Sequence, residues 1–398
     1  MHIMRTLFIC FLLGSLVWLI QQGPAPFSEP TAYLGILIVL PVLASRVAEK
    51  GGLPPYIGAL IAGFLLGPAG LFSRSALDAV QPFSELATAW VGLYLGASLS
   101  PSIISDRRSL YAASAAVIGT VLITSTFLFL TLDFVPVQAL QMGILAALAA
   151  PFFTHFSPPG PRRALSFSLL TTGLGLVLWG IFQAIHTPAV PPFSQPLLAL
   201  VLWGIGIELV YRCAHRMRTE PGRYILFGAT TLLILIASRS LRFSPLFLSL
   251  LTGLALSLRC GRNREPFRTL EGLSGLLVSL VLADFAARLN PVGILQLAPS
   301  HWQVLLIYAA SMAVGKTVGS ILGSRLTASS FRDWSQILPQ GLLAGVLMPH
   351  VLPPQRFTAL SPPAAIETGL ILICGIAIPI LLRPVWMLVE KIEINRVH

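Results

Sequence analysis

Long apolar runs alternate with short connectors rich in Arg, Gly and Pro along the whole chain. Runs such as Val117 to Leu132 and Ala364 to Leu382 approach or exceed the ~18–20 residues that a helix needs to cross a bilayer. Apolar runs bounded by breaker residues give about fourteen segments. They cover residues 6–20, 31–46, 55–69, 84–101, 110–130, 137–156, 164–185, 196–211, 224–240, 245–258, 270–290, 302–326, 334–352 and 363–388. The pattern predicts an all-α polytopic membrane protein with about thirteen transmembrane helices and an N-terminal signal or anchor helix.

Composition narrows the class of protein further. Hydrophobic residues make up 55% of the 398 residues and charged residues only 10%, whereas soluble proteins carry about 25% charged residues. The net charge is +11, but the basic residues lie in short connectors rather than on one continuous face. Such placement is typical of cytoplasmic loops. The sequence therefore excludes an ordinary soluble enzyme and gives no indication of nucleic-acid binding.

The distribution of basic residues predicts an orientation. With the N-terminus inside, twenty Lys and Arg residues fall on the inner side, five on the outer side, and Lys316 within the membrane. Because cytoplasmic loops carry the excess of positive charge, we expect an integral protein of the cell (inner) membrane with a cytoplasmic C-terminus.

The sequence lacks the motifs of metal, nucleotide and catalytic sites. The four cysteines lie far apart, and neither they nor the seven histidines have metal-ligand spacing. There is no GxGxxG after a strand-like run and no GxxxxGK[ST] loop. We therefore expect no metal, no cofactor and no enzymatic activity.

The chain resembles itself at an offset of 190 residues. Pro55–Gly63 matches Pro245–Gly253, and Leu95–Pro101 matches Phe285–Pro291. An odd number of predicted crossings separates the copies, so they should cross in opposite directions, as in the inverted repeats of secondary transporters. The predicted layout is a signal peptide or anchor at 1–30, a transmembrane domain at 31–390 (repeat one 31–186, linker helix 196–212, repeat two 224–390) and a short cytoplasmic tail at 391–398.

Prolines interrupt predicted helices at the same position of each repeat. Pro151 lies in the sixth segment, and Pro339, Gln340 and Gly341 lie in the thirteenth. A proline inside a helix frees backbone groups, which membranes tolerate only against protein or a water-filled cavity. We expect crossed broken helices with the substrate site between them near the midplane. The alternative is a kink that only shapes packing.

Two ionisable residues are predicted to lie within the membrane. Lys316 is close to the centre of its segment, where a charge costs about 2.5–3.5 kcal/mol on insertion scales, so it should face the interior. It is either a structural ammonium bonded to the free carbonyls of the broken helices or a proton carrier, because burial favours the neutral amine. Asp284 is the best buried acid by sequence, and its structural alternative is an ion pair with Arg288 one turn away.

Four segments resemble the monovalent cation:proton antiporter family. They are Ser45–Pro68, Ser244–Leu256, Val314–Gly319 and Leu338–Leu342. The resemblance extends over roughly residues 31–390. It implies an elevator-type antiporter, a homodimer in the lipid bilayer, that exchanges sodium or potassium for protons.

The sequence departs from this family at the ion site. The family's acidic pair falls on Thr171 and Thr172, and no acid lies in residues 164–185. Hydroxyls can coordinate sodium but do not ionise at neutral pH, so Asp284 or Lys316 would have to carry the proton. The expected site residues are Lys316, Thr171, Thr172, Gln340 and Asp284, framed by Pro151, Pro339 and Gly341.

Three functional hypotheses follow. The leading one is a cation:proton antiporter with an atypical or inactive ion site. The second is a sodium-coupled symporter of an organic anion, resembling the bile-acid:sodium symporters, because helix N-termini and Lys316 would suit a carboxylate. The third is a membrane sensor or partner protein that does not transport.

Overall fold

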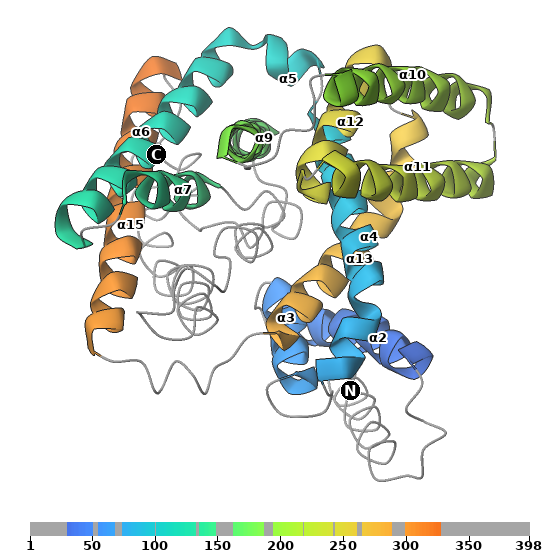
Figure 1. Cartoon of the computed structure of the whole chain (residues 1–398), viewed down its shortest axis with the longest axis horizontal. Coiled ribbons are helices and arrows are strands. Elements are labelled where there is room, and N and C mark those ends of the chain that lie inside the picture. The colour runs from blue at the N-terminus through green and yellow to red at the C-terminus, as the bar shows by residue number, and fades with distance from the viewer. Residues whose placement is uncertain are drawn as a thin grey trace, which may run out of the picture. The chain divides into compact units, whose positions relative to one another are not determined.

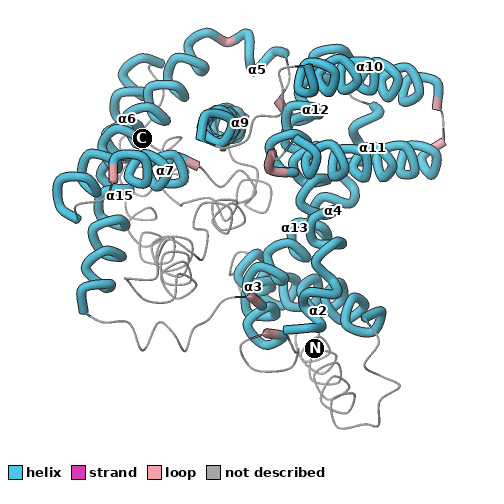
Figure 2. Tube along the Cα trace, in the orientation of Figure 1, coloured by secondary structure: helices cyan, strands magenta, loops and turns pink. Residues whose placement is uncertain are grey.

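The described part of the computed structural model consists of α-helices and one short 3-10 helix (Figure 1). The structure describes residues 30–50, 55–67, 74–99, 101–132, 135–148, 162–186, 194–217, 219–241, 243–260, 265–288 and 299–327. No β-strand occurs in these ranges (Figure 2), which confirms the predicted all-α class.

The chain divides into two compact units, and each takes one part from either half of the sequence. Unit 1 comprises Met1–Pro101 and Gln183–Leu289, and unit 2 comprises Ser102–Phe182 and Asn290–His398. The helices of unit 1 are α2 (Pro30–Lys50), α3 (Pro55–Leu66), α4 (Arg74–Ser98), α10 (Ser194–Arg216), α11 (Glu220–Leu241), α12 (Pro245–Cys260), η2 (Glu265–Phe267) and α13 (Arg268–Ala287). Those of unit 2 are α5 (Pro101–Ser105), α6 (Arg107–Leu132), α7 (Pro136–Ala147), most of α9 (Arg162–His186) and α15 (Pro299–Thr327).

Proline marks the start of many of these helices. The helices α2, α3, α5, α7, α12 and α15 all begin at a proline. Proline has no N–H to leave unpaired in the first turn, and its fixed φ already suits a helix. This local rule explains why several predicted boundaries agree with the structure to within a few residues.

Helices α4 and α7 differ most from their predicted bounds. Helix α4 begins at Arg74 rather than near residue 84, because its first turns are amphipathic and hydropathy detects only the apolar remainder. Helix α7 ends at Ala147, inside the predicted segment 137–156. The predicted segments 6–20, 334–352 and 363–388 lie outside the described residues, and the repeat boundaries stay a prediction.

Two close helix crossings in unit 1 are related to each other by the 190-residue offset. A Cβ added to Gly63 of α3 would collide with the Ala283 carbonyl of α13, and a Cβ added to Gly253 of α12 would collide with the Leu93 carbonyl of α4. Gly253 is Gly63 shifted by 190, and Ala283 is Leu93 shifted by 190. The crossing of α3 with α13 and the crossing of α12 with α4 are therefore equivalent. In each, a glycine from one copy of the repeat meets a carbonyl from the other copy, as two-fold symmetry between the copies requires.

Contacts along α4 and α13 give the direction of the two helices. Near one end of the crossing Trp90 Nε1 donates to Leu270 O (3.4 Å), and near the other Arg288 Nη2 donates to Leu77 O (2.7 Å). Residues late in α4 thus contact residues early in α13, and residues early in α4 contact the end of α13. The two helices are therefore antiparallel (Figure 1).

The remaining crossings extend this relation to both copies. Helix α3 runs parallel to α13, because Gly63 and Gly67 meet Ala283 and Ala287 in the same order. Helices α12 and α4 also cross in parallel order. Since α4 and α13 are antiparallel, α3 and α12 also run in opposite directions. Two antiparallel copies of the α3–α4 pair account for all of these contacts.

Unit 2 is built around a close contact of α6 with α15. Gly315 and Gly319 of α15 face Thr120 and Ala116 of α6, so the two helices are antiparallel. Glycines four residues apart let two helices approach closely. On its other side α6 packs against α7, where Gly143 approaches the helix.

Three helices among the described residues are long and apolar enough to cross a membrane. They are Arg107–Leu132, Glu220–Ser240 and Arg268–Ala287. Shorter apolar helices occur at Pro55–Leu66, Pro136–Ala147, Leu169–Phe182 and Pro245–Cys260.

Candidate functional site

Lys316 is buried inside unit 2 and contacts the end of a helix. Its side chain is 2% exposed, and its Nζ donates a hydrogen bond to the Leu148 carbonyl (3.1 Å). Tyr308, two turns earlier on the same face of α15, donates a longer bond to Met142 O (3.5 Å). This face of α15 therefore follows α7 to the point where α7 ends.

Helix α7 stops in the middle of a predicted apolar segment. Ala147 is its last residue, and Leu148 has an extended backbone with φ −63° and ψ 124°. The last carbonyls of any helix lack intrahelical donors and form the negative end of its dipole. The Lys316 amino group supplies a donor there, and a positive charge when it is protonated. Pro151, which the sequence places at this break, lies outside the described residues.

The hydroxyl pair of α9 lies near the same break. Gly175 packs against Leu148, so that a Cβ at Gly175 would lie 2.8 Å from the Leu148 Cδ2 atom. Thr171 and Thr172, three and four residues before Gly175, share its helix face and are each 1% exposed. The structure thus brings Lys316 of α15 and Gly175 of α9 to Leu148, with the two threonines one turn from Gly175 on the same helix face.

The described helices of unit 2 contain no Asp or Glu. Among the side chains described there, Lys316 is the only buried charged one. No group of three or more His, Cys, Asp or Glu that could hold a metal occurs in the described part of the chain. The buried polar groups of the described helices of unit 2 therefore include the Lys316 amine, several hydroxyls and the last carbonyls of α7.

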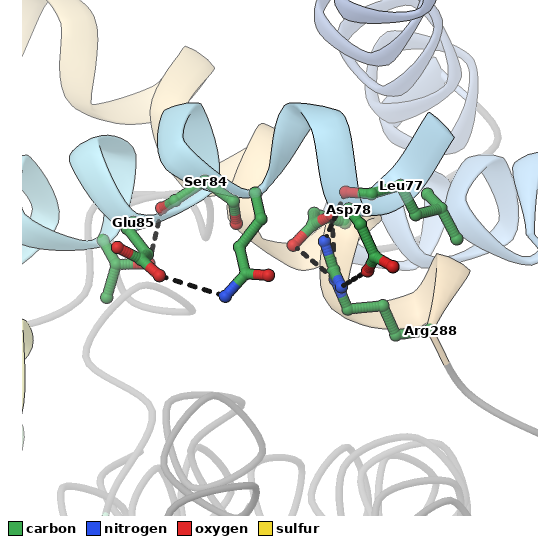
Figure 3. A network of polar contacts seen from close by, with 8 residues as sticks. Leu77, Asp78, Ser84, Glu85 and Arg288 are labelled. Atoms are coloured by element: carbon green, nitrogen blue, oxygen red, sulfur yellow. Dashed lines mark hydrogen bonds and ion pairs between the residues drawn. The ribbon is translucent and has the colours of Figure 1, made fainter. Parts of the chain in front are cut away.

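Asp284 belongs to unit 1 and pairs with Arg288, which Figure 3 shows beside Leu77 and Asp78 of α4. Its carboxylate is paired with Arg288 (Nε to Oδ2, 3.1 Å), at the spacing that the sequence analysis gave as its structural alternative. Arg288 also donates to Leu77 O (2.7 Å) and pairs with Asp78 (3.4 Å). These bonds join the end of α13 to the beginning of α4. The geometry favours a structural role for Asp284.

A second ion pair lies one to two turns further along α4. Glu85 accepts from Arg239 Nη2 of α11 (2.6 Å) and from Gln81 Nε2 (3.0 Å). The Arg239 side chain is 68% exposed, so water competes with this pair. Three further predicted site residues, Pro339, Gln340 and Gly341, lie outside the described residues.

Other polar groups of unit 2 were missed by the sequence analysis. Thr124 Oγ1, Ser125 Oγ and Trp179 Nε1 are buried and have no hydrogen-bond partner within the described part of the chain. Trp179 is one turn beyond Gly175 on α9 and stacks on Phe182. The only signal in the sequence was a four-residue spacing from other interior positions, which places these polar groups on an interior helix face.

Comparison with known proteins gives the family. The transmembrane sodium/hydrogen exchanger model matches residues 36–343. The structure of the sodium proton antiporter MjNhaP1 from Methanocaldococcus jannaschii at pH 8 is similar, with a TM-score of 0.66 and 17% identity over 90% of this chain and 96% of that chain. A 3D EM map of the same antiporter gives 0.65 and 16% over 91% and 97%. These likenesses establish the fold, and the family match covers most of the sequence. The chain belongs to the transmembrane sodium/hydrogen exchanger family, a family of integral membrane transporters.

Proposed function

We propose that the protein is a secondary transporter that exchanges a monovalent cation, sodium or potassium, for protons across the cell (inner) membrane. Membership of the exchanger family and a fold shared with a sodium proton antiporter support this class of activity. The observation that carries the proposal is the buried Lys316, whose ammonium donates to Leu148 O where α7 ends.

In this proposal Lys316 takes over the role of the missing acid. The protonated ammonium occupies the oxygen-rich end of α7. An entering cation would take the same Leu148 carbonyl, with oxygens of Thr171 and Thr172 as further ligands. Two unit charges ~4 Å apart repel by about 4 kcal/mol at an effective dielectric constant of 20. The cation therefore binds when Lys316 is neutral, and one proton leaves for each cation that enters.

This coupling has a consequence for charge movement. One cation replaces one proton on the lysine, so the occupied site carries a single positive charge in both states. The exchange is then electroneutral, and a membrane potential alone does not drive it.

Lys316→Arg separates the two possible roles of the lysine. Arginine keeps a positive donor for Leu148 O but does not deprotonate in proteins. In proteoliposomes with an internal pH dye and imposed sodium or potassium gradients, we expect Lys316→Arg to fold and to lose exchange. Exchange at the wild-type rate would refute the proton-carrier role.

A double variant tests whether either interior ionisable group is needed. Asp284 is held by Arg288, so we expect Asp284→Asn to retain exchange and Lys316→Ala to abolish it. Flux that survives both changes together would show that neither residue carries the proton. Wild-type protein that moves no protons under either gradient would contradict the function itself.

The arrangement of the membrane domain is also proposed. The antiparallel α3–α4 and α12–α13 pairs support two inverted repeats, at 31–186 and 224–390, that alternate access to a midplane site. The excess of inner basic residues supports a cytoplasmic C-terminus, which a C-terminal fluorescent reporter would test. We also propose a homodimer. Chemical cross-linking in native membranes that yields only monomer would contradict it.

One observation favours a second candidate function. The described helices of unit 2 carry a buried ammonium and no carboxylate, a balance that suits an anionic substrate. Sodium-coupled symport of an organic anion is the alternative. Sodium-dependent uptake of labelled carboxylates without proton movement would favour it, whereas proton flux without any carboxylate favours exchange.

A further inference from the structure

Most buried hydroxyls in these helices bond to their own backbone. Thr120 donates to Ala116 O (2.7 Å), and Ser311 donates to Tyr308 O (2.9 Å). This bond to a carbonyl three or four residues back is the usual way to satisfy Ser and Thr inside a helix. A buried helical hydroxyl that does not form it faces some other partner.

Thr124 and Ser125 are two such exceptions on adjacent positions of α6. Thr124 is 0% exposed, and neither its Oγ1 nor the buried Ser125 Oγ has a hydrogen-bond partner in the part of the chain that the structure describes. Leaving a hydroxyl buried without a hydrogen bond costs about 1–3 kcal/mol. Two neighbouring groups of this kind indicate a shared polar partner.

Both hydroxyls belong to the junction of α6, α7 and α15. Ser125 Oγ lies against Gly143 of α7, in the space that a side chain at that position would fill. Thr124 is one turn beyond Thr120, which faces Gly315 of α15. Because α6 and α15 are antiparallel, this turn lies level with Ser311.

Tyr308 and Met142 complete the junction from the other two helices. They are 0% and 4% exposed, and the tyrosine hydroxyl lies 3.5 Å from Met142 O. Most hydroxyl–oxygen hydrogen bonds are about 2.5–3.0 Å long. The bond to Met142 O is therefore a long one, and a tyrosine hydroxyl that donates one hydrogen bond can also accept one from water.

We propose that this junction is a water-binding site, in which Thr124 and Ser125 hold an ordered water that bridges α6 to Tyr308 of α15 and to α7. A buried water commonly makes about three hydrogen bonds to otherwise unsatisfied groups, and hydroxyls serve it as both donors and acceptors. A cation would use only the oxygen lone pairs, and the described helices of unit 2 contain no carboxylate to balance its charge.

The site has a role that rests on the proposed function of Lys316. Ser311 and Tyr308 precede Lys316 on α15 by five and eight residues, which is about 7 Å and 12 Å along the helix. In the predicted orientation the junction lies on the outer side of the lysine. Water bound here would lie between Lys316 and the outer side of the membrane, in a position to relay a proton toward the lysine.

Radiolytic hydroxyl-radical labelling tests the water directly, because radicals formed from bound water oxidise side chains that bulk radicals do not reach. We expect oxidation of Tyr308 and Met142 in the full-length protein, with Tyr56 of unit 1, also buried at 4% exposure, as the unlabelled reference. Thr124→Val with Ser125→Ala should remove most of the Tyr308 label. A wild-type Tyr308 as unreactive as Tyr56, or a label unchanged in the double variant, overturns the site.

A matched pair of valine substitutions gives a second, independent readout. Thr124→Val removes a hydroxyl of the proposed water site, whereas Thr120→Val removes one that already bonds to Ala116 O in its own helix. We expect the thermal unfolding midpoint to fall in Thr124→Val and to change little in Thr120→Val. A midpoint that rises in Thr124→Val means a dry junction and overturns the site, because an isosteric apolar group then relieves an unsatisfied hydroxyl.

Ion titration separates water from a bound cation. The Tyr308 label should be the same in sodium, potassium and choline chloride. A label that falls as sodium or potassium rises means a cation site and overturns the water site. Labelling needs no ion gradient, so its result stands whether or not Lys316→Arg abolishes exchange.

Discussion

Alanine at Gly253 should separate α12 from α4 and destabilise unit 1. A Cβ there would lie 2.8 Å from the Ala97 nitrogen and closer still to the Leu93 carbonyl, whereas ordinary contacts begin near 3.4 Å. The helices would have to move apart by about 0.5–1 Å, which forfeits a quarter to a half of each van der Waals contact along the crossing. Overpacking of this kind typically costs about 1–3 kcal/mol. The higher helix propensity of alanine offsets at most about 1 kcal/mol.

Because the two crossings are related by the 190-residue offset, the matching glycine should respond in the same way. Gly63→Ala would place a Cβ 2.6 Å from the Ala286 Cβ in the matching crossing, so it should destabilise to a similar extent. Gly228 of α11 has no atom within 4 Å of its Cβ position and provides the control, with an unchanged or higher midpoint in Gly228→Ala. Thermal unfolding in detergent, followed by tryptophan fluorescence, compares the three variants. If Gly253→Ala has the same unfolding midpoint as Gly228→Ala, the close crossing at Gly253 is refuted. If the midpoint of Gly63→Ala differs from that of Gly253→Ala, the equivalence of the two crossings is refuted.

The remaining predictions concern polar contacts at helix ends. Asp284→Asn should lower the free energy of unfolding by about 1.5–3 kcal/mol, the usual contribution of a hydrogen bond to a charged group, because Arg288 loses its best buried partner. Glu85→Gln changes an exposed pair and should cost less than about 1 kcal/mol. Equal unfolding midpoints for the two variants would contradict this prediction. Asp106 accepts from the Ser109 hydroxyl (2.6 Å) at the start of α6, so Asp106→Ala should cost about 1 kcal/mol and Asp106→Asn much less, and an Asn variant as unstable as the Ala variant would argue against a cap. The Ser109 hydrogen bond lowers the pKa of Asp106 from its ordinary value of 3.8, so its contribution to stability is complete above that pH and is lost as the pH falls through the lowered value. Unfolding midpoints measured from pH 6 down to pH 3 should therefore show the difference between the wild type and Asp106→Ala shrinking as the pH falls.

Local rules made much of the fold predictable. Apolar runs and helix-starting prolines located the described helices, and the repeat match placed Gly63 and Gly253 at equivalent positions before any contact was known. The spacing of Asp284 and Arg288 indicated an ion pair within one turn. Hydropathy was wrong at the start of α4, because the turns from Arg74 to Phe83 are amphipathic and include the charged residues Arg74 and Asp78.

The partners within the candidate site were not predictable in the same way. Lys316 was identifiable as a buried charge, but its bond to the Leu148 carbonyl depends on where α7 ends and on which helix lies beside it. Thr120 and Thr124 look alike in sequence, one turn apart on one face of α6. One bonds to its own helix and the other does not, and only the packing of three helices distinguishes them.

The sequence by itself determined the class of protein, the approximate positions of most described helices, the offset of the repeat and the lack of an acid in α9. These follow from hydropathy, backbone chemistry and the spacing of residues along the chain. Only the tertiary structure decided which carbonyl receives the lysine, which glycines carry the close crossings and which hydroxyls are left without a bond in their own helix. Those outcomes depend on the separation and direction of helices far apart in the chain, and no local pattern encodes such distances.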